Sequence, residues 1–152
     1  MNPDLLASLI AYMRTNGALV AAFGDSTATP KFWSNYGALQ TTITDPIMPY
    51  LVFVEPNESK SYETADATGN PSDAASGVLV ADIYASTEVL ARQLGEQVCG
   101  VLNDCDDTIV GLFYFRRTSQ AMPPLPSTGP DASPTIFRRQ IHFRYMLEDL
   151  LV

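Results

Sequence analysis

The chain has 152 residues, the size of one ordinary domain, and 46% of them are apolar, which is enough for a hydrophobic core. Its 17 acidic residues outnumber its 9 basic ones and give a net charge of −8. This balance excludes a protein that coats nucleic acid through a basic face, and it disfavours a polybasic membrane binder.

The N-terminal segment is apolar, but it matches neither a signal peptide nor a membrane span. Asp4 lies where a signal peptide carries positive charge, and Arg14 interrupts the apolar run. Cys99 and Cys105 are six positions apart and match no redox or zinc motif. Their spacing permits a disulfide without requiring one, and two reduced thiols of a protein made in the cytoplasm are the expected state.

The first helix is predicted over residues 3–15, where apolar residues recur at intervals of three and four and Asn2 and Pro3 provide a typical start. Asn16-Gly17 is a stop signal, and residues 18–23 form a short second helical turn. Proline and glycine break any long element between residues 24 and 46. The aromatic patch at residues 31–36 is expected in a loop or short helix, as a small satellite core.

Four strands and a second main helix are predicted in the remainder. The dense apolar run at residues 49–55 predicts an interior strand, and residues 78–85 predict a second strand. Ser86 or Thr87 caps a helix that runs to about residue 102, with Gly95 and Gly100 inside it for close packing against a neighbour. Strands follow at residues 109–117 and 135–147, and the alternation in the last one is typical of an antiparallel strand buried on one side.

These elements predict an α+β fold with a mostly antiparallel sheet of about four strands and two main helices packed on one face. The chain is expected to form a single domain over residues 1–152. Two long loops are expected within it, a polar one at residues 56–76 and a proline-rich one at residues 118–134.

The sequence offers little catalytic chemistry. His142 is the single imidazole, and Asp82 is a candidate carboxylate neighbour across the sheet, yet no nucleophile elbow, Cys–His signature or zinc-protease motif is present. The acidic corner of Asp104, Asp106 and Asp107 lacks the glycine and glutamate of a calcium loop and is expected to be a solvated turn. The glycines form no nucleotide-binding motif, so no cofactor and no metal are expected.

The arginines are the most informative side chains. Arg116-Arg117 and Arg138-Arg139 lie on the last two strands, where each pair places one side chain on each face. If these strands form a hairpin, the four arginines crowd near its loop end. They then serve either as a docking patch for an acidic partner surface or passing DNA, or as cross-strand partners of carboxylates. The candidate interface residues are Arg116, Arg117, Arg138, Arg139, His142 and Arg144, and the candidate carboxylates are Asp82, Asp131 and Glu148.

The order of several segments resembles a known family. The N-terminal helix NPDLLASLIAYMRTN is followed by D-P-x-x-P-Y-L-V-F, which begins at Asp45-Pro46 and contains Pro49-Tyr50. The strand VLVADIYAS, the helix STEVLARQLGEQVCGVL and the final strand FRRQIHFRYML come next. Across most of its length the chain is similar to the tail-completion or tail-terminator proteins of long-tailed bacteriophages and prophages, although its second loop is unusually rich in proline.

This resemblance implies a non-enzymatic subunit of a ring, usually a hexamer, at the head-proximal end of the tail tube. Such a ring caps tube polymerisation and joins the tail to the neck, so the implied partners are other copies of the chain, the tail-tube protein and the neck or connector protein. DNA passes through without specific binding, no membrane is involved, and assembly takes place in the host cytoplasm. The alternatives are a neck or connector subunit, a small adaptor that binds a peptide partner, and a hydrolase that uses His142.

Overall fold

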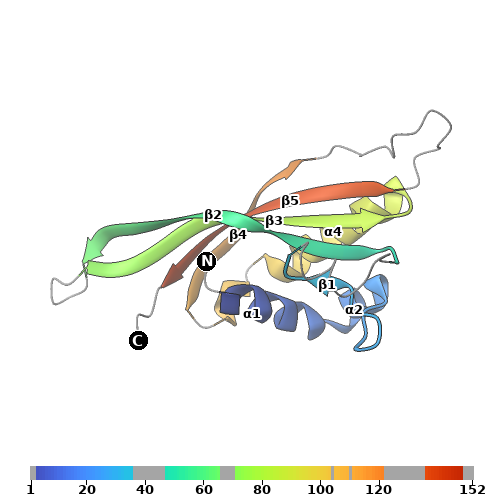
Figure 1. Ribbon diagram of the computed structural model, residues 1–152, viewed down its shortest axis with the longest axis horizontal. Helices are drawn as coiled ribbons and strands as arrows, with labels where there is room; N and C mark the ends of the chain where they lie inside the picture. The colour runs from blue at the N-terminus through green and yellow to red at the C-terminus, as the bar shows by residue number, and fades with distance from the viewer. Residues whose placement is uncertain are drawn as a thin grey trace.

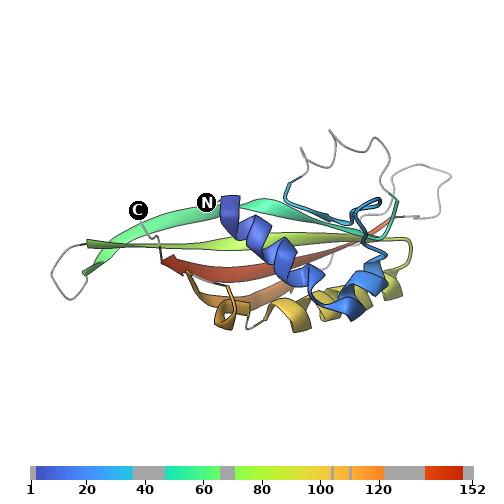
Figure 2. The same ribbon diagram turned by 90° about the horizontal axis from the view of Figure 1, so that it is seen from below.

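A computed structural model describes residues 3–35, 47–65, 71–103, 105–109, 111–121 and 136–148 of the chain (Figure 1). Within these ranges, three α-helices and one 3-10 turn accompany a five-stranded sheet. The fold is α+β, as predicted, with one strand and one short helix more than the main elements expected from the sequence. The three helices lie across one face of the sheet (Figure 2).

The two N-terminal helices are α1, Pro3–Arg14, and α2, Gly17–Phe23. Asn16 ends the first helix and also caps the second, because its side chain accepts a hydrogen bond of 2.9 Å from the backbone N–H of Leu19. Gly24 closes α2 with a φ of 68°, a left-handed conformation that glycine adopts without strain. The predicted stop at Asn16-Gly17 is therefore a sharp turn between two helices.

No single helix in the described ranges has the length and hydropathy to cross a membrane. The pair Leu5–Arg14 and Gly17–Phe23 reaches that hydropathy only together, and it is bent by 94°.

The second main helix, α4, spans Glu88–Leu102. Thr87 is its N-cap and accepts a hydrogen bond of 3.1 Å from the Leu90 N–H. Its apolar stripe packs on the sheet as the spacing predicts, since Leu94, Val98 and Leu102 are buried. Cys99 of α4 and Cys105 of the 3-10 turn η1, Cys105–Asp107, are both buried and form no disulfide.

The sheet has the strand order β1-β2-β3-β5-β4. Its strands are β1, Phe32–Trp33; β2, Tyr50–Ala65; β3, Pro71–Ala85; β4, Leu112–Ala121; and β5, Phe137–Glu148. The short β1 runs parallel to β2, and all other neighbours are antiparallel. Alternate side chains enter the core from Leu79 to Ala85 of β3 and from Ile141 to Tyr145 of β5, among them Ile83 and Phe143. The interior character expected of residues 49–55 is confirmed, because Leu51, Val52 and Phe53 are inaccessible to solvent.

The prediction of a long loop over residues 56–76 was wrong. The strands β2 and β3 continue as a hairpin whose ladder reaches Thr64↔Ser72 and Ala65↔Pro71. This hairpin projects past the helices (Figures 1 and 2). The segment lacks apolar alternation because no helix covers it there, and a ladder of backbone hydrogen bonds does not require apolar side chains. Likewise β4 continues to Ala121, four residues into the second predicted loop, while residues 122–135 lie outside the described part of the chain.

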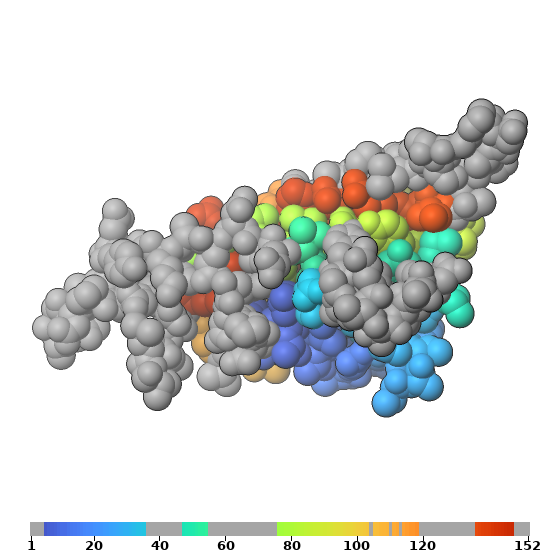
Figure 3. Space-filling model, in the orientation of Figure 1, coloured from blue at the N-terminus to red at the C-terminus, as the bar shows by residue number. Residues whose placement is uncertain are grey.

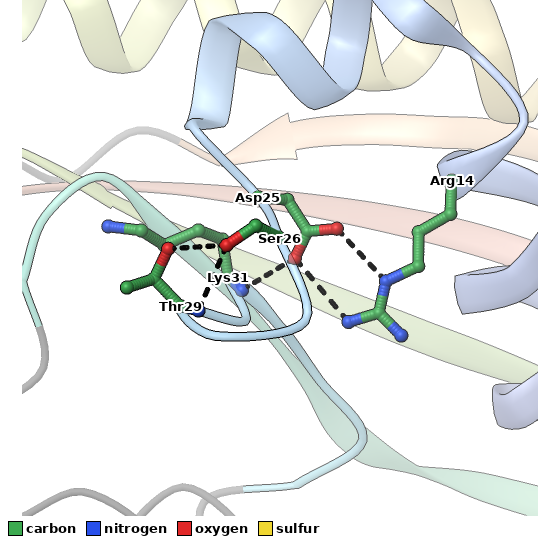
Figure 4. A network of polar contacts seen from close by, with 5 residues as sticks. All are labelled: Arg14, Asp25, Ser26, Thr29 and Lys31. Carbon is green, nitrogen blue, oxygen red and sulfur yellow. Dashed lines mark hydrogen bonds and ion pairs between the residues drawn. The ribbon is translucent and has the colours of Figure 1, made fainter.

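The aromatic patch at residues 31–36, described as far as Asn35, contains a short strand between residues without regular structure, and no helix. Phe32 and Trp33 instead make the parallel strand β1 beside Leu51 and Val52, and Phe32 contacts Phe23 of α2 edge-on with ring centroids 5.0 Å apart. Asp25 fixes this connection, because it forms an ion pair of 3.0 Å with Arg14 and accepts a 2.8 Å hydrogen bond from the Lys31 N–H (Figure 4). A two-residue strand has no periodicity, so its position depends on contacts that only the fold creates.

Candidate assembly interface

The last two strands pair as a hairpin, as the arginine hypothesis requires, but the register separates the two arginine pairs. Arg116 lies opposite Arg144, and Arg117 lies opposite Phe143. The last β4–β5 pair among the described residues is Ala121↔Gln140, and Arg138 and Arg139 lie beyond it, opposite Tyr84 and Ile83 of β3. The predicted crowding at the loop end was therefore wrong, because β4 extends farther than its apolar run and leaves Arg116-Arg117 in the middle of the strand.

Two arginines of the inner face converge on one carboxylate of α4. Glu96 lies 3.6 Å from an Nη atom of Arg117 and 3.7 Å from one of Arg139. Arg139 is only 4% exposed and passes beneath the helix at Gly95, where an added Cβ would lie 3.0 Å from the Arg139 Cγ. The close packing predicted for Gly95 is therefore made with β5 of the same chain, and Arg139 is a structural residue between helix and sheet.

Arg117 borders an open depression of about 480 Å³ between α4 and β4 that sequence reasoning missed. The pKa of its guanidinium is raised, first by a hydrogen bond to the Cys99 side chain and the charge of its sulfur, and further by Glu96. Gly100 and Asn103 also line the depression, and nothing lies within 4 Å of a Cβ added at Gly100. The close packing predicted for Gly100 is therefore not made with the described residues of this chain, and a glycine inside a helix was the one sequence signal for this hollow.

Arg116 anchors the 3-10 turn to β4. Its Nη1 lies 2.6 Å from Asp106 Oδ1, and its guanidinium stands 5.5 Å from the centre of the Tyr114 ring. The expectation of a freely solvated acidic corner was wrong for Asp106, whose side chain is 10% exposed, while Asp107 is exposed. Asp104 lies outside the described residues. In the ranges that the structure describes, no group of three potential metal ligands exists.

The outer face of the sheet, away from the helices, carries Arg138, Gln140, His142 and Arg144 of β5. His142 and Asp82 do not meet, because Gln140 lies between them. The Gln140 amide donates to Asp82 Oδ1 over 3.1 Å, and its Oε1 is 3.3 Å from His142 Nε2. An amide does not accept a proton from imidazole as a carboxylate does. This arrangement orders the side chains on the sheet, and Asp82 does not directly orient His142 as a general base.

Arg138 and Arg144 differ from Arg116, Arg117 and Arg139 in having no ionic partner among the described residues. Arg144 is exposed, and the half-buried Arg138 has a buried Nε without a hydrogen-bond partner in that part of the chain. Tyr50, Tyr84 and Arg138 lie in one row across three strands, and the two tyrosine rings stack at 4.9 Å. Burial, followed by the neighbouring Tyr84, raises the pKa of Tyr50 to about 12. Residues of β3 and β5 lie at the molecular surface above the α1–α2 layer (Figure 3).

No family model matches the sequence, and no curated protein matches it. Among solved structures, the fold is similar to that of a chain in the "Virion of native gene transfer agent (GTA) particle", with a TM-score of 0.68. The likeness covers 95% of this chain and 94% of the other, at 14% sequence identity. At that identity the comparison establishes a common fold over nearly the whole length of both chains.

Proposed function

We propose that this chain is a structural subunit of a phage-like virion, a tail terminator that forms a ring, caps the tail tube at its head-proximal end and joins the tail to the neck. The observation that carries the proposal is the fold shared with a chain of a gene transfer agent virion, which extends over 95% of this chain. The element order that resembles tail-completion proteins supports the more specific role.

The arrangement of side chains supports a non-catalytic subunit. Three of the six candidate interface residues, Arg116, Arg117 and Arg139, form ion pairs within the chain, and His142 contacts an amide. The proposed ring contains six copies, each a single domain, and binds the tail-tube protein on one side and the neck protein on the other. Its acidic composition lets DNA pass through the ring without specific binding, because like charges repel. It assembles in the host cytoplasm and remains in the virion.

A neck or connector subunit is the second candidate, because the same fold likeness accommodates it. Deleting the gene from the genome that encodes the particle separates the two roles by electron microscopy. Loss of a terminator leaves tube growth uncapped and yields headless tails of variable length. Loss of a connector yields tails of normal length beside separate filled heads. Normal infectious or transducing particles in the absence of the gene would contradict both.

A further inference from the structure

Asp82 is a buried acidic residue that the proposed virion role does not use. It lies on β3, in the outer face of the sheet, directly opposite Gln140 of β5, and it is 2% exposed. Gln140 Nε2 lies 3.1 Å from Asp82 Oδ1. Because a buried carboxylate needs hydrogen bonds in place of its lost water, Asp82 constrains the side chains that donate to it.

The hydrogen bond to Asp82 determines which way the Gln140 amide points. An ionised carboxylate only accepts hydrogen bonds, so the NH2 group of Gln140 must face Asp82. The amide oxygen then faces the opposite way, and Gln140 Oε1 lies 3.3 Å from His142 Nε2. In the reversed amide, two acceptor oxygens would face each other next to Asp82. The chemistry of the carboxylate therefore excludes the reversed orientation.

The orientation of the amide in turn determines which nitrogen of His142 carries a proton. A carbonyl oxygen cannot donate, so the contact with Gln140 is a hydrogen bond only when His142 Nε2 is protonated. A neutral imidazole has one N–H, and its Nδ1 then carries a lone pair. Nδ1 has no hydrogen-bond partner in the described part of the chain, and the structure does not bury it.

We propose that Asp82 is a positioning residue that acts through Gln140 to hold neutral His142 as the Nε2–H tautomer. Asp82, Gln140 and His142 are called the relay. The relay presents Nδ1 as a hydrogen-bond acceptor on the outer face of the sheet. Protonation then takes place at Nδ1 alone, because Nε2 already donates to Gln140. The outer face exchanges an acceptor for a donor and a positive charge, while the hydrogen bonds of the relay persist. This inference goes beyond the virion role and does not depend on it.

The charged neighbours of His142 determine what the added proton changes. The charged and titratable groups around it on the outer face, among the described residues, are Arg138 and Arg144 on β5, Asp82 and Tyr84 on β3, and Arg116 on β4 with its ion-pair partner Asp106. Arg138 and Arg144 have no ionic partner in that part of the chain. Protonation of His142 therefore adds a third cation to a stripe of β5 that already carries two.

An amide suits this arrangement better than a carboxylate would. The Gln140 side chain is uncharged, so it accepts from the same N–H in the neutral and in the protonated ring. A carboxylate in its place would favour the protonated ring through its charge. Imidazole is the side chain whose ordinary titration falls between about pH 5 and 8. The relay thus fixes the ring in both of its charge states.

Nitrogen-15 NMR tests the tautomer directly, since His142 is the only histidine in the chain. At about pH 8.5, above the range in which imidazoles titrate, we expect one ring nitrogen at the shift of an N–H and the other at that of a lone-pair nitrogen. Couplings to both ring carbon protons identify the N–H as Nε2. Lowering the pH to about 5 moves the Nδ1 signal toward the N–H region and leaves Nε2 nearly unchanged.

Variants test whether Asp82 acts through Gln140. Asp82→Asn permits either orientation of the amide, so the two ring-nitrogen shifts move toward each other at high pH. In a Gln140→Met background, where the relay is broken, Asp82→Asn has no further effect, and both nitrogens shift on acidification. Arg144→Gln removes a neighbouring charge outside the relay and is the matched control, with shifts at high pH like those of the wild type. Circular dichroism checks folding.

Three results would overturn the proposal. They are an Nδ1–H tautomer in the wild type, shifts that do not respond to Asp82→Asn, and an equal response to Asp82→Asn with and without Gln140. If Asp82→Asn fails to fold, Gln140→Met alone decides, because it must bring the shifts of the two nitrogens closer together. None of these results affects the virion role, which depends on the particles that form without the gene.

Discussion

The two glycines of α4 give a paired test of how helix and sheet are packed. Gly95 and Gly100 lie in the same helix, and alanine at either position gains about 1 kcal/mol of helix propensity. At Gly100 nothing lies within 4 Å of the added Cβ, and the residue is exposed. We therefore expect Gly100→Ala to stabilise the protein by about 0.5–1 kcal/mol.

At Gly95 the same methyl group meets the sheet. The added Cβ would lie 3.0 Å from Cγ and 3.4 Å from Nε of Arg139, and 3.5 Å from Cδ1 of Ile141. Arg139 is buried and its Cγ is close to its own backbone, so the side chain has little freedom to move away. Overpacking in a dense interior costs about 1–3 kcal/mol, which outweighs the gain in helix propensity. The expected net effect of Gly95→Ala is a loss of about 0–2 kcal/mol.

Thermal and urea denaturation of the two variants, at concentrations where the protein is monomeric, measure this difference. A change of 1 kcal/mol shifts the melting temperature of a domain of this size by about 2–4 °C. Gly100→Ala should melt above the wild type, and Gly95→Ala at or below it. If Gly95→Ala stabilised the protein as much as Gly100→Ala, the close approach of Arg139 to the helix would be refuted.

Three further predictions concern the Thr87 cap, the contacts of Asp25 and the half-buried Tyr50. Thr87→Ala removes the acceptor for the Leu90 N–H and is expected to cost about 1 kcal/mol by urea denaturation, whereas Thr87→Ser retains it. Asp25→Ala removes both the ion pair to Arg14 and the hydrogen bond that joins α2 to β1, with an expected loss of about 1–2 kcal/mol, while Asp25→Asn loses less because an acceptor oxygen remains. The folded-state pKa of Tyr50 is raised from 10.0 to about 12, so its contribution to stability is complete below pH 10.0 and is lost as the pH rises toward 12. Tyr50→Phe should flatten the fall in denaturation midpoint over this range, and an unchanged slope would contradict the burial of the phenol.

Much of the fold is predictable because local and long-range preferences agree. The apolar stripe of α4 and the alternation of β5 require a covered face, and both elements bury that face in the same core. The cap at Thr87 acts within three residues, so adjacent positions are sufficient to predict a cap at Ser86 or Thr87, and the break at Asn16-Gly17 is equally local. Such elements have nearly the same bounds in the structure as in the sequence analysis.

The outer part of the β2–β3 hairpin and β1 were not predictable by the same reasoning. Polar residues in the outer part of the hairpin form strands because the backbones of β2 and β3 are hydrogen-bonded to each other. That pairing leaves no periodic pattern of side chains in the sequence. The placement of Arg117 and Arg139 beside one carboxylate depends on the register between β4, β5 and α4. Sequence reasoning named all six candidate residues but did not separate the three that form internal ion pairs from Arg138 and Arg144.

By itself, the sequence determined an acidic α+β chain with two amphipathic helices, four core strands and no recognisable catalytic or metal-binding motif. These properties follow from composition and local periodicity, because every amphipathic helix or strand is stabilised by burying its apolar face. Only the tertiary structure decided that the β2–β3 ladder extends as far as Ala65↔Pro71, and that Arg117 and Arg139 both pair with Glu96. Strand register and the extent of a backbone ladder depend on residues far apart in the chain, and they set which charges meet within it.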